Sequence, residues 1–135
     1  ANKNSIKIIG GTTNKYCQAY FSYDSKKSGG YTSSHLRFGD LPITSPYLVT
    51  TPDFVACHVP SYVDKYDVLK GLKTGGSFLL NSVHDAETTC ATLPDHMKVY
   101  LAKNKINFYI LNFFMSFWYF SNSFQQFFSF KYSSF

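Results

Sequence analysis

The sequence predicts an α/β domain built around a mostly parallel sheet. The main evidence is a strand–helix–strand pattern over residues 53–81, where a β-rich run, an amphipathic stretch and a second β-rich run follow in order. Two strands joined by such a crossover lie parallel in one sheet. A helix and a strand beyond this unit extend the alternation, and 135 residues suffice for one modest core.

The first third of the chain predicts a strand, a helix and another strand. Residues 5–10 are a β-branched run ended by glycines, which is typical of a buried strand. Asn14 can cap a helix over residues 16–23, because aromatic residues recur there at helical spacing. The glycine pair at residues 29–30 breaks the chain before a polar, hydroxyl-rich strand that runs to about Phe38.

The strand–helix–strand unit is the clearest local pattern. DFVAC, residues 53–57, predicts its first strand, and SFLLN, residues 77–81, predicts its second. Ser61 has Asp64 three residues later, a capping-box pattern that marks a helix start. The apolar stripe of this helix, which the pair Gly75–Gly76 ends, comprises Tyr62, Tyr66, Leu69 and Leu72.

Beyond this unit, residues 84–87 are assigned to a loop. A helix from about Pro94 to Asn104 then leads into an apolar strand over residues 107–111. Neither GxGxxG nor a Walker A motif occurs, so ordinary dinucleotide or P-loop chemistry has no support. The net charge of +5 is too diffuse to indicate nucleic-acid binding.

The three cysteines, Cys17, Cys57 and Cys90, are widely spaced and form no CxxC pair. An iron–sulfur or zinc site built from this chain alone is therefore not expected. Cys57 precedes His58, but neighbours on a strand point to opposite faces, which argues against a thiolate–imidazole pair. We interpret the cysteines as buried structural thiols of a reducing compartment.

One stretch, residues 23–40, concentrates groups that bind anions. The adjacent glycines let backbone amides approach a ligand closely, and lysine and arginine side chains supply positive charge. The candidate site residues are Lys26, Lys27, Ser28, Gly29, Gly30 and Arg37. A solvated loop is the alternative, since lysines are mostly exposed wherever they occur.

Four blocks of the chain resemble, in the same order, segments of the third (gamma-type) domain of the pyruvate:ferredoxin (flavodoxin) oxidoreductase family. They are ANKNSIKIIG at residues 1–10, YDSKKSGGYTSSHLRFGD at 23–40, the segment from SPYLVTTPDF to GSFLLNS at 45–82, and LPDHMKVYLAKNKINFY at 93–109. The resemblance implies a partial domain over residues 1–109. It also implies a layered fold, with extra antiparallel strands beside the parallel sheet.

The resemblance implies a function as well. Enzymes of this family oxidatively decarboxylate pyruvate to acetyl-coenzyme A with thiamine diphosphate, and pass electrons through iron–sulfur clusters to ferredoxin or flavodoxin. The third domain is associated with coenzyme A, so the basic loop and Arg37 are candidate coenzyme A contacts or, alternatively, domain-packing residues. No catalytic or metal-binding residue is assigned, and this fragment alone is expected to be inactive and to bind none of these cofactors.

The partners implied by the resemblance are the remaining domains of the parent oxidoreductase and, for the full enzyme, ferredoxin or flavodoxin. The full enzyme is expected to be a cytoplasmic homodimer with neither nucleic-acid nor membrane partners. Two other functions stay open from the residues: a stand-alone α/β module that binds a phosphorylated ligand, and a tail-anchored membrane protein.

The membrane alternative rests on residues 110–135, which depart from the pattern before them. Ten of the 14 phenylalanines lie in residues 108–135, and Lys131 is the single charged residue after position 110. The apolar run over residues 106–120 is shorter than the ~20 residues that a spanning helix needs. We interpret the tail as low-complexity sequence outside the domain, such as a frameshift or gene-fragment boundary produces, and expect the chain to be a piece of a longer protein.

Overall fold

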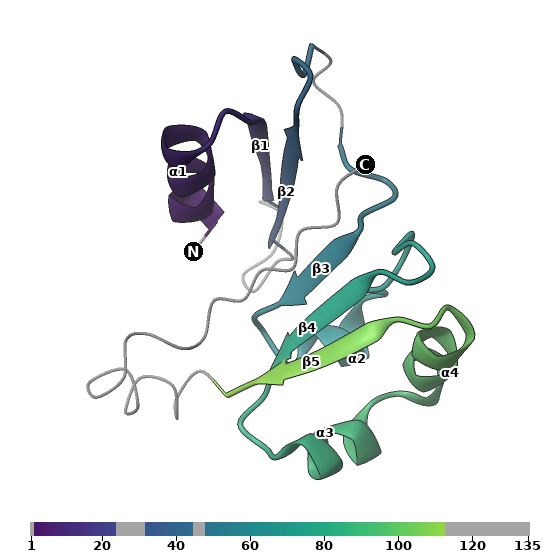
Figure 1. The fold of residues 1–135 in the computed structure, drawn as a ribbon. Coiled ribbons are helices and arrows are strands. Elements are labelled where there is room, and N and C mark those ends of the chain that lie inside the picture. The colour runs from purple at the N-terminus through teal and green to yellow at the C-terminus, as the bar shows by residue number, and fades with distance from the viewer. Residues whose placement is uncertain (1, 24–31, 45–47, 113–135) are drawn as a thin grey trace. The chain divides into compact units, whose positions relative to one another are not determined.

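The computed structural model describes residues 2–23, 32–44 and 48–112, which belong to two compact units divided after Pro52 (Figure 1). The first unit holds a two-stranded antiparallel sheet, and the second holds a three-stranded parallel sheet. The α/β class, the parallel sheet and the extra antiparallel strands are therefore confirmed.

The first unit is a helix followed by a β-hairpin. Helix α1 spans Asn2–Thr12, strand β1 spans Tyr16–Tyr23 and strand β2 spans Thr32–Gly39. The two strands pair without interruption from Tyr16 opposite Gly39 to Tyr23 opposite Thr32. The polar strand expected after the glycine pair is thus confirmed as β2.

The strand predicted over residues 5–10 is wrong, because this segment lies within α1. Ile6 and Ile9 are half-buried and Ile8 is 61% exposed, which is the spacing of a helix with one face covered. A Cβ on Gly10 would lie 3.1 Å from the sulfur of Cys17, so the helix approaches β1 closely at this glycine. Packing on the hairpin prevails here over the strand preference of isoleucine.

The helix predicted over residues 16–23 is also wrong, because this segment is β1. The small and apolar residues Cys17, Ala19 and Phe21 alternate with Gln18 and other polar or aromatic residues, which is the period of a strand. Tyrosine and phenylalanine favour strands, and pairing with β2 uses the backbone groups that a helix would bond internally.

The second unit contains strands β3 (Phe54–Cys57), β4 (Ser77–Asn81) and β5 (Asn107–Leu111) in the order β3-β4-β5. Both neighbouring pairs are parallel, so the predicted strand–helix–strand unit and the later strand are confirmed. Its helices are α2 (Tyr62–Lys65), α3 (Ala86–Thr92) and α4 (Asp95–Lys103), and α4 matches the helix expected after Pro94.

The helix between β3 and β4 is much shorter than predicted. Ser61 has a helical backbone conformation and makes no side-chain cap, so the capping-box prediction is wrong. Tyr66 is already extended, and Gly71 has φ of 79°, a left-handed conformation that no α-helix contains. Leu69 and Leu72 are nevertheless 1% and 2% exposed, so turns bury the apolar stripe in place of a helix.

Helix α3 occupies the segment that begins in the predicted loop at residues 84–87. Asp85 is its N-cap, and its carboxylate accepts a hydrogen bond from the amide of Thr88 at 3.1 Å. Hydrogen bonds from the hydroxyl of Thr88, and then from its amide, lower the pKa of the Asp85 carboxyl. This carboxylate therefore starts a helix, as aspartate commonly does at an N-cap.

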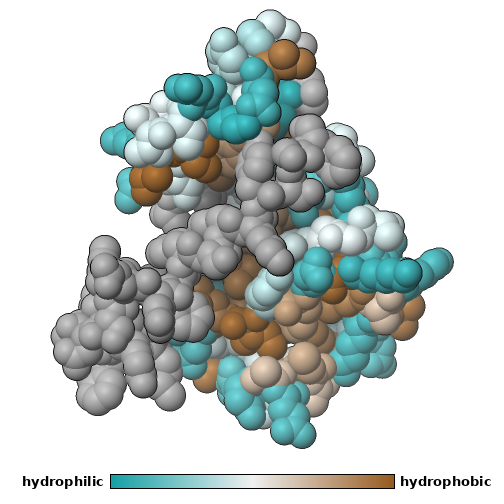
Figure 2. Space-filling model, viewed as in Figure 1, coloured by the Kyte–Doolittle hydropathy of each residue, from teal (hydrophilic) through white to brown (hydrophobic). Residues whose placement is uncertain are grey.

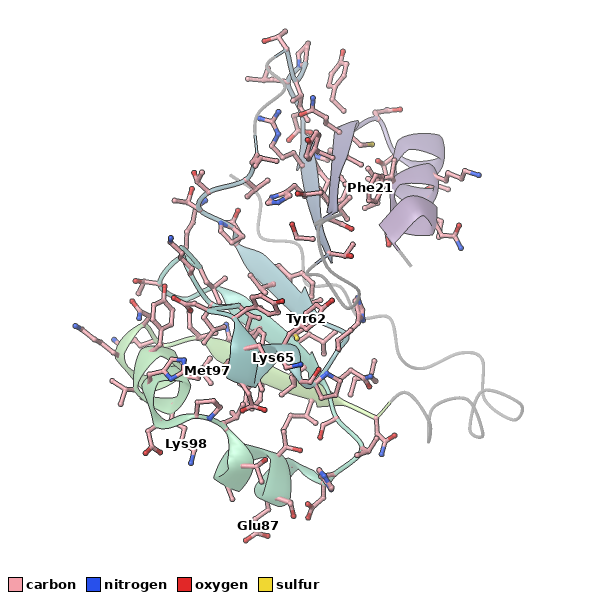
Figure 3. The ribbon with its side chains drawn as sticks, turned by 180° about the vertical axis from the view of Figure 1, so that it is seen from behind. Phe21, Tyr62, Lys65, Glu87, Met97 and Lys98 are labelled. Carbon is pink, nitrogen blue, oxygen red and sulfur yellow. The ribbon has the colours of Figure 1, made fainter. Side chains whose placement is uncertain are left out.

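The core of the second unit lies between the sheet and its helices. Phe78 in the central strand is fully buried and stacks on Phe108 of β5, with ring centroids 5.5 Å apart. In Figure 3, which views the sheet from behind, Tyr62 and Met97 lie on the helical side of the sheet. The remaining buried apolar residues are Cys57, Val63, Leu69, Leu72, Leu80 and Leu93.

A tight turn before β4 sets the register of the central strand. A Cβ on Gly76 would lie 2.8 Å from the carbonyl oxygen of Lys73 and 2.9 Å from that of Asp53, so only glycine fits. The amide of Ser77 donates to the carbonyl of Asp53, which joins the turn to the start of β3.

None of the helices in the described part of the chain is long and apolar enough to cross a membrane.

We predict that Phe78→Ala lowers the unfolding free energy of this chain by about 3–5 kcal/mol, because it leaves a cavity beside Phe108. The matched control is Phe54→Ala on the neighbouring strand, where the ring is 51% exposed and the expected loss is below about 1 kcal/mol. Urea titrations of the three proteins measure both values. Equal losses would show that Phe78 is not the centre of the core.

Candidate functional site

The basic loop joins the two paired ends of the β1–β2 hairpin. Lys26, Lys27, Ser28, Gly29 and Gly30 lie outside the described residues. The residues on either side are described, and Tyr23 pairs directly with Thr32. Residues 24–31 therefore connect β1 to β2.

Arg37 is the candidate residue that the structure describes, and it lies toward the far end of the hairpin. It stands opposite Gln18 in the strand register, and its Nη2 donates a hydrogen bond to Oε1 of Gln18. Arg37 follows Thr32 by five residues on β2, which is about 17 Å of extended strand. The hairpin thus separates Arg37 from the strand ends that flank the lysines.

A polar face of the hairpin surrounds Arg37. Directly opposite residues share one side of an antiparallel pair, which groups Gln18 with Arg37 and Tyr20 with His35. Ser33 lies on the same side, with its Oγ 3.1 Å from Nε2 of His35. This face presents hydroxyl, imidazole, amide and guanidinium groups together, and Tyr20 is 55% exposed.

Sequence reasoning missed the contribution of β1 to this face. The helix expected over residues 16–23 placed neither Gln18 nor Tyr20 beside Arg37. The alternation of small and apolar residues at positions 17, 19 and 21 was the available indication that this segment is a strand.

The carboxyl edge of the parallel sheet in the second unit is a common place for ligands in α/β proteins. In this unit, the polar side chains at that edge donate hydrogen bonds to the backbone of neighbouring loops. Asn81 Nδ2 donates to the carbonyl of His58 at 3.1 Å, and Asn112 Nδ2 donates to that of Val83 at 3.2 Å. The buried hydroxyls of Ser82 and Thr89 lie 2.8 Å apart. These contacts fix the start of α3 against β4 and β5.

Cys57 is a structural thiol, as expected. It is 5% exposed at the end of β3, and its Sγ donates to the carbonyl of Val59 at 3.2 Å. Burial raises the pKa of the Cys57 thiol, which is the opposite of the change that activates a nucleophilic cysteine. Since folding raises this pKa, the thiol lowers stability as pH rises above the value of about 8.5 for an unfolded cysteine, and has no such effect below it.

The expectation that all three thiols are buried is wrong for Cys90, which is exposed on α3, while Cys17 is half-buried. Within the described residues, no group of three or more histidine, cysteine, aspartate or glutamate side chains is arranged to hold a metal ion.

Comparisons with known proteins match most of the chain. The family model described as "Pyruvate ferredoxin/flavodoxin oxidoreductase" matches residues 1–115. The pyruvate-flavodoxin oxidoreductase of Klebsiella pneumoniae is 62% identical over 113 residues, which are 83% of this chain and 10% of that protein. The pyruvate:ferredoxin oxidoreductase of Moorella thermoacetica is 59% identical over 109 residues, which are 81% of this chain and 9% of that protein.

The chain thus spans about a tenth of the length of the curated relatives that it matches. Among solved structures, the pyruvate oxidoreductase subunit PORC of Thermotoga maritima is similar with a TM-score of 0.43 and 23% identity, covering 67% of this chain and 51% of that subunit.

The thiols should differ in reactivity according to their burial. We predict that Cys90 reacts with an aromatic disulfide reagent at pH 8 at least about tenfold faster than Cys57, because Cys57 is enclosed and protonated. Mass spectrometry of timed samples identifies the modified residue, and Cys57→Ser should remove the slowest phase. Denaturant should bring the two rates together. Fast modification of Cys57 in the folded chain would refute its structural role.

Proposed function

This chain belongs to the pyruvate ferredoxin/flavodoxin oxidoreductase family, and on that premise we propose that it is part of an enzyme that oxidatively decarboxylates pyruvate to acetyl-coenzyme A. Ferredoxin or flavodoxin accepts the electrons. The single observation that carries the proposal is the 62% identity with a pyruvate-flavodoxin oxidoreductase over 83% of the chain. Identity of this degree, over a segment that holds both units, supports the same role for the segment.

The proposed contribution of this segment is scaffold and ligand contact. An iron–sulfur cluster needs about four cysteine ligands, whereas this chain has three cysteines, of which Cys57 is buried and protonated. The described residues therefore do not fit a cluster. The GDG motif that the family's thiamine diphosphate site carries is absent, since Gly39-Asp40 is followed by Leu41. Thiamine diphosphate and the clusters are assigned to other domains of the enzyme.

Contacts with coenzyme A are proposed for the hairpin of the first unit. Its loop carries Lys26, Lys27 and Ser28 beside the pair Gly29–Gly30, groups that suit phosphate oxygens. Arg37 is proposed as a second contact, about 17 Å along β2 from Thr32.

The chain covers about a tenth of its relatives, so most of the enzyme lies in other domains. The remaining domains of the oxidoreductase are its direct partners, and the assembled enzyme is proposed to be a cytoplasmic homodimer.

The chain alone should lack oxidoreductase activity, because its residues fit neither a thiamine site nor a cluster. We expect the purified 135-residue protein to give no pyruvate-dependent reduction of a viologen dye under anaerobic conditions with coenzyme A and thiamine diphosphate present. A longer family enzyme carrying this segment is the positive control. Reduction of the dye by the chain alone would contradict the assignment of thiamine diphosphate and the clusters to other domains.

The lysines of the hairpin loop should matter for coenzyme A. In a longer enzyme carrying this segment, we predict that replacing both Lys26 and Lys27 by Ala raises the Michaelis constant for coenzyme A at least about tenfold. A charge-assisted contact is worth about 1.5–3 kcal/mol, and about 1.4 kcal/mol is a tenfold change in binding. The constant for pyruvate should change much less.

The matched control removes the same charge elsewhere, by replacing the exposed Lys65 and Lys70 with Ala. Steady-state kinetics at two salt concentrations measures both constants, and the effect at the loop should weaken as salt rises. Unchanged kinetics together with a lower melting temperature would identify Lys26 and Lys27 as packing residues and contradict the phosphate contact.

A further inference from the structure

The parallel sheet of the second unit has one face that its helices leave uncovered. Alternate residues of β3, β4 and β5 point to this side, and the strand register places Ala56, Leu79 and Tyr109 in one row across the sheet. Phe54 lies before this row on β3, and Leu111 lies after it on β5. We call these five residues the open face.

The other side of the same strands forms the core. Val55 and Phe108 pack against the buried cluster, which includes Cys57, Phe78 and Leu80. Figure 1 shows α2, α3 and α4 beside and behind the sheet, with the opposite face turned to the viewer. Among the described residues of this unit, no helix covers that face. Figure 2, in the same view, shows brown and tan side chains gathered over it.

The open face is apolar, and three of its five residues are exposed, whereas Ala56 and Leu79 are half-buried. Tyr109 is 54% exposed, Phe54 51% and Leu111 36%. The other described strand residues on this side are polar but uncharged, namely Ser77, Asn81 and Asn107. Contiguous apolar surface of this kind marks interaction sites, and parallel sheets in α/β proteins are almost always covered on both faces.

We propose that the open face packs against an apolar layer that another part of the same oxidoreductase polypeptide, beyond residues 1–135, contributes. This inference rests on the proposed function. The relatives are about ten times as long as the aligned segment, so most of their chain is available to supply that layer. An exposed face without charged residues selects an apolar partner.

A pair of charge-introducing variants tests the proposal. Tyr109→Glu places a carboxylate on the open face, in the middle of the edge strand β5. The control, Val99→Glu, places one on α4, where Val99 is 63% exposed. Both are made in this chain and in a longer family enzyme that carries the segment. In the chain alone, we expect each variant to shift the melting temperature by less than about 4 °C.

In the longer enzyme, Tyr109→Glu should lower the melting temperature by several degrees more than Val99→Glu. Hydroxyl-radical labelling supplies a measurement without variants: modification of Tyr109 should fall at least about threefold from the chain to the longer enzyme, while modification of Val99 stays unchanged. The activity of the unmodified longer enzyme is measured separately, so a wrong proposed function is distinguished from a wrong surface.

Three results would overturn the proposal. Equal labelling of Tyr109 in both proteins, with both variants tolerated, would mean that the face stays open. A large destabilisation of the chain alone by Tyr109→Glu would mean that a part of this chain covers the face. Concentration-dependent dimerisation of the chain that Tyr109→Glu abolishes would assign the face to a second copy.

Discussion

The parallel pairing of β3, β4 and β5 is the constraint on which the second unit depends. Parallel neighbours cannot be joined by a tight turn, so each connection must cross a face of the sheet and bring apolar residues onto it. Leu69 and Leu72 serve this purpose in the first crossover, and Leu93 and Met97 serve it in the second. Phe78 in the central strand lies beneath both connections, which explains why it is fully buried.

The same constraint has a consequence for function. Both crossovers serve one face, so the unit presents its other face as an apolar surface of the kind that larger assemblies cover. The first unit has a related character, since none of its described side chains is fully buried. Each unit therefore has the features of a component that completes its packing within a larger enzyme, which agrees with the small share of the relatives that the chain covers.

The sequence predicted the second unit much better than the first. Strands β3 and β4 are apolar runs that closely follow a proline or a glycine pair, and the stripe of Leu69 and Leu72 identified core positions even though the helix ends at Lys65. In the first unit, short segments rich in isoleucine and tyrosine fit either element, and contacts distant in sequence decided between them. For the candidate site, the sequence predicted the strand that carries Arg37. It did not predict the hydrogen bond from Arg37 to Gln18, because that contact requires residues 16–23 to form a strand instead of a helix. The role of the loop lysines stays a prediction.

The genomic sequence on both sides of this coding region tests most directly whether the chain is a component of a larger oxidoreductase. We expect the flanking reading frames to encode thiamine diphosphate-binding and ferredoxin-like domains in the order found in full-length relatives, with a transcript that joins them. A complete gene with its own start codon, expressed as a separate transcript and without such neighbours, would contradict this and favour an independent α/β protein.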